Sequence, residues 1–110
     1  MLSVVKREFP NEDAQAIVAL LDAYGVESYE NERDRVQLAI LKLSQGEAEK
    51  LLDWIDIAKR DYRDVLAFAE YPGQMRAPVK LATDLVQKIA EEDRTQYVAW
   101  LLRRQGEKAS

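Results

Sequence analysis

The sequence contains no cysteine and no histidine. Without cysteine it can form no disulfide, no thiolate zinc site and no cysteine nucleophile. Without histidine it lacks the commonest general base and the commonest metal ligand. A Ser-His-Asp triad, a Cys-His pair, an HExxH zinc site and a Glu-x-x-His di-iron site are therefore excluded.

Basic side chains are also fewer than acidic ones. The chain has 16 lysines and arginines against 20 acids, a net charge of -4. Nucleic-acid-binding domains are usually basic, because neutralising phosphates supplies most of their affinity. Lys6-Arg7 and Arg103-Arg104 are only pairs and form no basic stripe. We therefore expect no nucleic-acid partner.

Long apolar runs are absent too. No stretch approaches the roughly 18 apolar residues that a membrane-spanning helix needs. The first ten residues lack the charged segment and long apolar stretch of a signal peptide. We expect no membrane partner and a cytoplasmic location, with which the absence of cysteine agrees.

Helical periodicity is what the sequence has in abundance. Of its 110 residues, 47% are apolar, enough for one core without disulfides or metals. Apolar residues recur with the i, i+3, i+4, i+7 spacing of a helix face. The sequence predicts an all-α fold, a compact bundle of four or five helices. One domain is expected over residues 1–104, with a linker-like break at 72–77 and a frayed tail at 105–110.

Caps and helix breakers divide the first half of the chain into separate helices. Residues 1–9 are ambiguous and could form a short extended piece. Pro10-Asn11-Glu12-Asp13 predicts a helix start capped by the asparagine, and Gly25 predicts its end. A second helix is expected over 31–43; it is apolar almost all round and should be the central, buried element.

The second half is predicted from breakers and caps. Ser44-Gln-Gly-Glu47 matches a capping box and should open the longest helix, over about 45–70. After the break, Pro78 suits a new helix start. Asp93 is a second possible cap, so the remainder is either two helices or one long bent helix.

Carboxylates are the only plausible catalytic or ligating groups that remain. The sequence contains three acid-x-x-acid pairs: Glu27 and Glu30, Asp53 and Asp56, and Asp61 and Asp64. On a helix such pairs point the same way and could share a magnesium ion. Two such pairs on neighbouring helices resemble the magnesium site of all-helical nucleotide pyrophosphatases. Basic neighbours and a solvated helix face explain them more simply. We therefore expect no catalytic residues, no metal and no cofactor.

Aromatic and aliphatic residues beside the main helical stripes suggest an interface. Trp54, Ile57 and Phe68 widen the apolar face of the long helix, and Trp100 and Leu101 lie in the last segment. These residues either complete the core or contact another chain, since aromatic anchors dominate interfaces. The last helices could pack on their own domain or on a second subunit.

Three segments resemble small uncharacterised bacterial helical proteins: Arg35-Val-Gln-Leu-Ala-Ile-Leu-Lys-Leu-Ser44, and the stretches over 58–67 and 69–72. This resemblance covers the middle third of the chain and implies a bacterial cytoplasmic origin with no assigned activity. Tyr62-Arg-Asp-Val-Leu66 is also similar to segments of small acidic helical immunity proteins, which neutralise toxins.

These observations favour a non-enzymatic protein-interaction or regulatory module. An immunity-like role is one form of this hypothesis, and the partner is either another protein or a second copy of the chain. The alternative is a magnesium-dependent phosphohydrolase that uses the clustered carboxylates.

Overall fold

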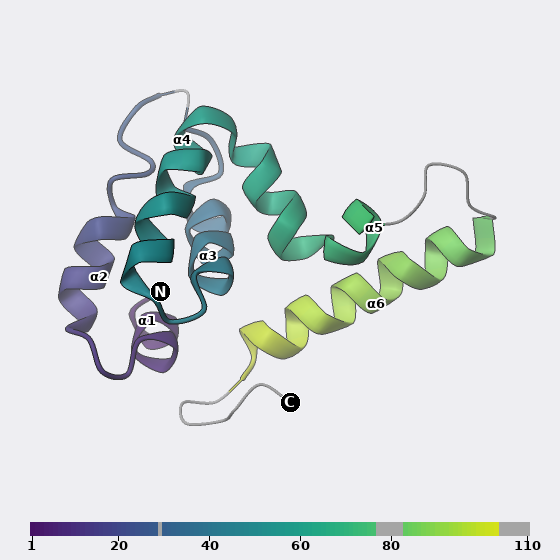
Figure 1. Cartoon of the computed structure of the whole chain (residues 1–110), viewed down its shortest axis with the longest axis horizontal. Coiled ribbons are helices and arrows are strands. Elements are labelled where there is room, and N and C mark those ends of the chain that lie inside the picture. The colour runs from purple at the N-terminus through teal and green to yellow at the C-terminus, as the bar shows by residue number, and fades with distance from the viewer. Residues whose placement is uncertain (29, 77–82, 104–110) are drawn as a thin grey trace.

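The computed structural model describes residues 1–28, 30–76 and 83–103, which form six helices and no strand (Figure 1). The helices are α1 (Leu2–Glu8), α2 (Ala14–Leu21), α3 (Arg33–Ser44), α4 (Ala48–Glu70), α5 (Pro72–Arg76) and α6 (Thr83–Leu101). The predicted all-α bundle is confirmed. Helix α1 forms in the N-terminal segment that the sequence left ambiguous, and α5 forms within the predicted linker at 72–77.

The N-terminal segment is helical because it packs. Val5 of α1 and Phe9, which follows the helix four residues later, are both buried in the core. Tertiary contacts of this kind override the weak helix propensity of adjacent valines. Helix α2 then begins at Ala14, and its cap is Asp13, whose carboxylate accepts the N–H of Gln15 at 3.0 Å. The predicted cap, Asn11, lies outside the helix.

Helix α3 is the buried centre, as its sequence predicts. Val36, Ala39, Ile40 and Leu41 are all fully buried, and α3 packs chiefly against α4. A buried amide joins α3 to the end of α2. Gln37 donates to the carbonyl oxygens of Leu21 and Tyr24 at 3.0 and 3.1 Å.

The predicted capping box at Ser44 is wrong. Ser44 is the last residue of α3, and its hydroxyl donates to the carbonyl of Ile40 at 2.5 Å. Gly46 then turns the chain at a φ of 76°, a conformation that favours glycine. Helix α4 starts after Glu47, which makes no side-chain cap.

Helix α4 is sharply bent at Asp61. This residue has φ -154° and ψ 97°, whereas a continuous helix was predicted. Its carboxylate accepts the N–H of Arg63 at 3.1 Å, so Asp61 caps a new helical segment. The bend brings the rings of Trp54 and Phe68 to a centroid separation of 5.8 Å. Residues so far apart would be separated by about 21 Å along a straight helix.

The bend divides the molecule into two parts. We call residues 1–60 the body and the described residues of 62–103 the arm. In Figure 1 the arm descends from the bend through α5, and α6 then runs back toward α1. The radius of gyration is 14.7 Å, above the roughly 13 Å of a spherical domain of this length.

One carboxylate of α6 joins it to α5 in the arm. Asp93, buried in the middle of α6, accepts the N–H groups of Gly73 and Gln74 at 2.7 and 3.0 Å. Asp93 therefore caps α5, and the predicted cap of its own helix is wrong. From residue 83 onward α6 is one helix. The expected start at Pro78 and the tail at 105–110 lie outside the described residues.

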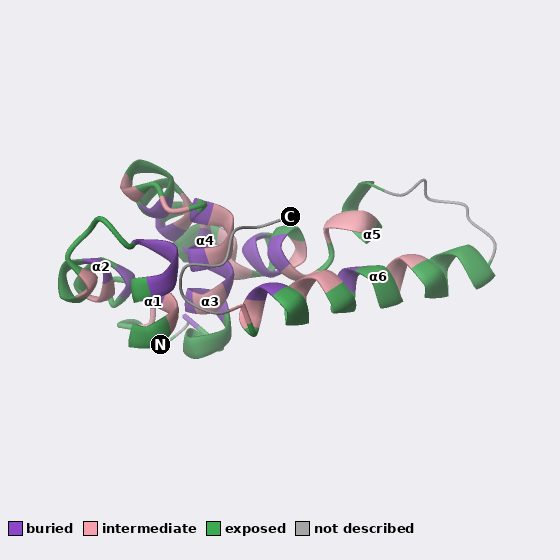
Figure 2. Ribbon diagram, turned by 90° about the horizontal axis from the view of Figure 1, so that it is seen from below, coloured by how far each residue is buried: buried purple, intermediate pink, exposed green. Residues whose placement is uncertain are grey.

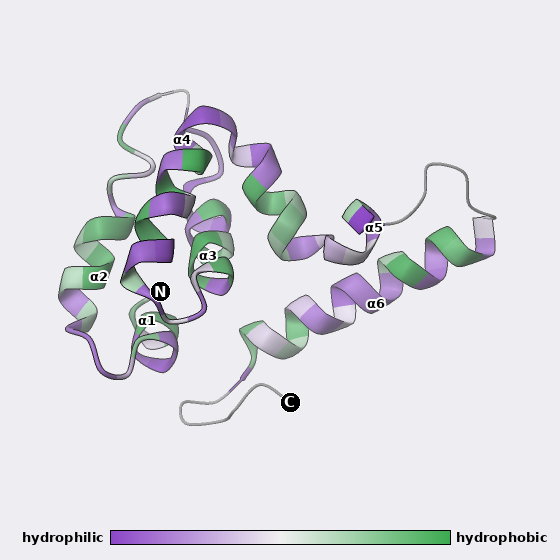
Figure 3. Ribbon diagram, viewed as in Figure 1, coloured by the Kyte–Doolittle hydropathy of each residue, from purple (hydrophilic) through white to green (hydrophobic). Residues whose placement is uncertain are grey.

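Most of α6 faces outward. Figure 2 shows exposed residues along its length, and only Asp93 and Trp100 are buried. Apolar segments nevertheless occur on α6 as they do on the packed helices α2 and α3 (Figure 3). Within the described part of the chain, no helix is both long enough and apolar enough to cross a bilayer.

Candidate functional site

Exposed apolar side chains are concentrated on the arm. Of the 12 exposed large hydrophobic side chains in the described residues, seven lie between positions 68 and 102. Five of these follow one another through α4, α5 and the start of α6, with exposed fractions of 41–49%: Phe68, Tyr71, Met75, Leu85 and Val86. The three helices contact one another, and we call these five residues the distal surface.

The residues predicted as an interface do not share one location. Phe68 is exposed, and the partly buried Trp54 packs its ring against it. Ile57 and Leu101 are also partly buried and pack against the core. Trp100 is only 8% exposed, because it lies against α1. Of the predicted set, Phe68 alone is on the distal surface.

Trp100 is part of a polar contact between the two ends of the chain, which we call the clasp (Arg7, Glu8, Trp100 and Arg103). The indole N–H donates to the carboxylate of Glu8 at 2.9 Å, and Arg103 pairs with the same carboxylate. The guanidinium of Arg7 lies 5.0 Å from the indole ring centre. Trp100 therefore packs against α1 of its own chain in this structure.

The clasp also closes the end of α6. Arg7 donates to the carbonyl oxygens of Leu101 and Arg103 at 2.9 and 2.6 Å. A cation there satisfies carbonyls that a helix terminus leaves unpaired and complements the helix dipole. Two nitrogen atoms of the clasp are left unpaired among the described residues. Within the same part of the chain, one Nη of Arg7 and the Nε of Arg103 are buried and have no hydrogen-bond partner, which costs about 1–3 kcal/mol each.

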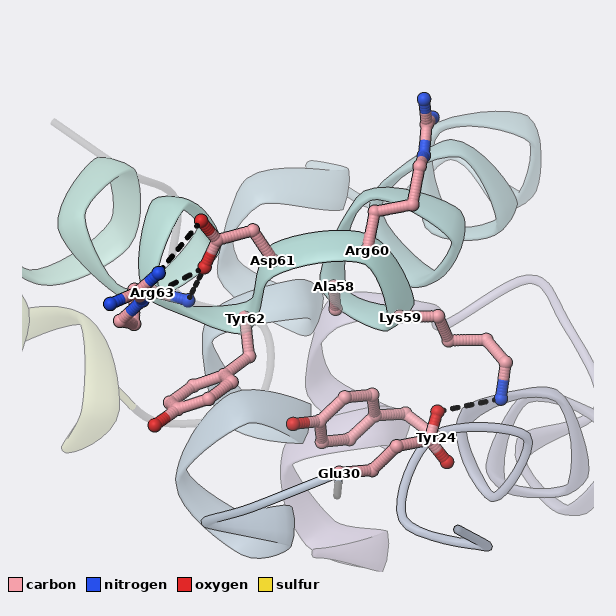
Figure 4. A pocket seen from close by; sticks show the side chains of 8 residues that line it. All are labelled: Tyr24, Glu30, Ala58, Lys59, Arg60, Asp61, Tyr62 and Arg63. Atoms are coloured by element: carbon pink, nitrogen blue, oxygen red, sulfur yellow. Dashed lines mark hydrogen bonds and ion pairs between the residues drawn. The ribbon is translucent and has the colours of Figure 1, made fainter.

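A cavity of about 260 Å³ lies beside the bend of α4 (Figure 4). Its wall combines the end of α2, the loop before α3 and the bend itself, and consists of Tyr24, Glu30, Ala58, Lys59, Arg60, Asp61, Tyr62 and Arg63. In Figure 4, Glu30 and the rings of Tyr24 and Tyr62 lie beneath the bend, while Arg60 points away from them.

Glu30 organises the loop that borders this cavity. One carboxylate oxygen accepts three backbone N–H groups, from Gly25, Val26 and Glu27, at 3.0–3.2 Å. The other pairs with Lys59 at 2.7 Å. Burial acts to raise the pKa of Glu30, but these hydrogen bonds and the lysine charge outweigh it and hold that pKa below its usual 4.5.

Tyr24, Arg60 and Arg63 of the cavity wall also have partners. Tyr24 donates to the carbonyl of Asn31 at 2.7 Å, and burial, with the nearby charge of Glu30, raises its pKa to about 12. Arg60 pairs with Asp56 at 2.6 Å. Arg63 pairs with Asp61 at 3.1 Å and lowers the pKa of that carboxyl. The cavity is thus bordered by ion pairs that already satisfy one another.

The surroundings of the three acid-x-x-acid pairs therefore differ from those of a shared metal site. Glu30 holds a loop, Asp56 pairs with its helix neighbour, and Asp61 caps the second half of α4. Across residues 1–28, 30–76 and 83–103, no three acidic side chains gather closely enough to hold a metal ion.

Comparisons of the chain with protein-family models, with curated proteins and with solved structures find no match.

Proposed function

We propose that this protein is a non-enzymatic interaction module that contacts another protein through the distal surface. The observation that carries the proposal is the succession of exposed apolar residues from Phe68 to Val86. Exposed apolar side chains gathered on neighbouring helices are a common feature of contact sites. Phe68 and Tyr71 supply the aromatic side chains that contribute most at interfaces.

The resemblance of segment 62–66 to immunity proteins supports one kind of partner. An immunity-like role would make the partner a toxin, and a bacterial cytoplasmic setting belongs to the same proposal. A second copy of the chain is the simplest alternative, since one apolar patch then covers another across a two-fold axis.

A paired-variant experiment tests the contact surface. Phe68→Glu with Leu85→Glu places two charges on the distal surface, and Gln87→Glu, at an exposed position of α6 two residues after Leu85, is the matched control. We expect the wild-type protein and the control to retain the same partner at fixed stoichiometry in pull-downs from the native cell. The double variant should lose it, and purified components should reproduce the difference.

Light scattering of the purified chain distinguishes the two kinds of partner. A mass that rises with concentration, and does not rise in the double variant, would identify a second copy. Equal retention of every bound protein by the wild type and both variants would contradict the proposal. The hydrolase alternative requires saturable magnesium or manganese binding by calorimetry, removed by Asp53→Asn with Asp56→Asn.

A further inference from the structure

The backbone change that bends α4 is confined to a single residue. Between Ala48 and Glu70 only Asp61 departs from helical backbone angles. Sharp kinks usually occur at proline, at glycine or at an inserted group, and this stretch contains neither proline nor glycine. What holds the bend locally is the exposed contact of the Asp61 carboxylate with the N–H and guanidinium of Arg63. The bent and straight forms of α4 are therefore both open to this sequence.

Straightening would separate the arm from its own body. With Asp61 in a helical conformation, α4 would be a rod about 34 Å long, with its backbone hydrogen bonds restored across position 61. Trp54 and Phe68, now in ring contact, would move to opposite halves of that rod. The arm could then no longer reach its own α3 and α1.

A second copy offers the arm the same partners. Val65, Leu66 and Ala69 of the arm are buried in the core. Glu70 accepts two hydrogen bonds from Arg35 of α3, at 2.6 and 2.9 Å, and the clasp holds the end of α6 on α1. Exchange of arms between two chains would recreate all of these contacts across a two-fold axis, which is how domain swapping stabilises a dimer.

We propose that Asp61 is a hinge and that two chains exchange their arms when α4 straightens. The occupant of the vacated surface on α3 and α1 is the arm of a second copy. This inference does not rest on the distal surface, because the exchanged contacts are the buried ones. Exchange is slow, since the arm must leave its own core before it enters another.

Tyr62→Pro tests the hinge by locking the bend. Position 62 is the first residue of the segment that Asp61 caps, where proline is well tolerated. Proline also restricts the preceding residue to the extended region that Asp61 already occupies, and it prevents a continuous helix. We expect this variant to stay monomeric by light scattering after refolding at high concentration. Tyr62→Ala is the control for loss of the ring and should still form dimers.

Asp61→Ala should shift α4 toward the straight form. It removes the cap and places the best helix former at the bend. Loss of a capping side chain typically changes such an equilibrium about fivefold for each bend, so the dimer should form at lower concentration than in the wild type. An unchanged or smaller dimer fraction would show that Asp61 is not the hinge, even if Tyr62→Pro failed to fold.

Spin labels at Glu49→Cys and Ala67→Cys separate exchange from surface association, and the absence of native cysteine makes this labelling clean. The doubly labelled chain is mixed with an excess of unlabelled chain, so that only distances within one chain are measured. In an exchanged dimer the separation should reach the roughly 27 Å of a straight helix. A dimer that kept the shorter separation of the monomer would overturn arm exchange and would leave self-association through an outer surface intact.

Discussion

Glu8 and Trp100 lie 92 residues apart in sequence, and the indole N–H of Trp100 donates to the carboxylate of Glu8 at 2.9 Å. The same carboxylate receives Arg103, so one acid of α1 holds the end of α6 through two donors. Because both side chains are buried, the arm is attached to the body at its far end as well as at the bend. The clasp therefore decides which surface of the arm stays exposed.

Removing the indole donor should weaken this attachment. Trp100→Phe keeps an aromatic ring but leaves the Glu8 carboxylate without one of its hydrogen bonds. Hydrogen bonds to charged groups contribute about 1.5–3 kcal/mol, and we expect a decrease of that size in the free energy of unfolding, measured in urea. In the background of Glu8→Gln, which removes the charge, the same substitution should cost less. An equal cost in both backgrounds would show that Trp100 acts only through its packing.

Burial in α3 predicts a second difference in stability. Ile40 is fully buried at the centre of the core, whereas Asp64 is exposed on α4. Ile40→Ala should lower the free energy of unfolding by about 2–5 kcal/mol, because it removes apolar contact and leaves a cavity. Asp64→Ala should change it by no more than about 0.5 kcal/mol. Thermal melts of the two variants provide the comparison, and equal shifts would contradict the central position of α3.

Glu30 predicts how stability depends on pH. Its pKa in the folded chain lies below the usual 4.5, so the fold favours the ionised carboxylate. That contribution is fully present above pH 4.5 and is lost as the pH falls through the lowered pKa of the folded state. The urea midpoint of the wild-type protein should therefore decrease on acidification below pH 4.5.

A matched pair of variants isolates this contribution. Glu30→Gln should be less stable than the wild type at neutral pH and should lose part of the acid dependence. Glu27→Gln, an exposed acid in the same loop, is the control and should leave both properties nearly unchanged. If the wild type and Glu30→Gln lost stability in parallel on acidification, another carboxylate would be responsible.

Part of this structure could be predicted from local sequence because a helix buries one face at a fixed period. The positions of α2, α3 and α4 and the burial of Ile40 follow from that period. One sequence signal could have predicted the bend, but Asp61 was interpreted instead as half of an acid pair. Aspartate is a strong N-cap, and Asp61 precedes Tyr62-Arg-Asp64, a plausible first turn. The same carboxylate also suits the exposed face of an uninterrupted helix, so spacing does not distinguish the two.

The sequence by itself determined the all-helical class, the buried character of α3 and the absence of cysteine and histidine chemistry, because these depend on composition and on residues within a few turns of one another. Only the tertiary structure decided that α4 bends at Asp61, that Asp93 caps α5 and that Trp100 packs on Glu8. The contacts of Asp93 and Trp100 depend on partners far away in sequence, and the bend depends on how the second half of α4 packs on the core. The distal surface follows from the same contacts, since burial of Trp100 in the clasp leaves the other end of α6 uncovered.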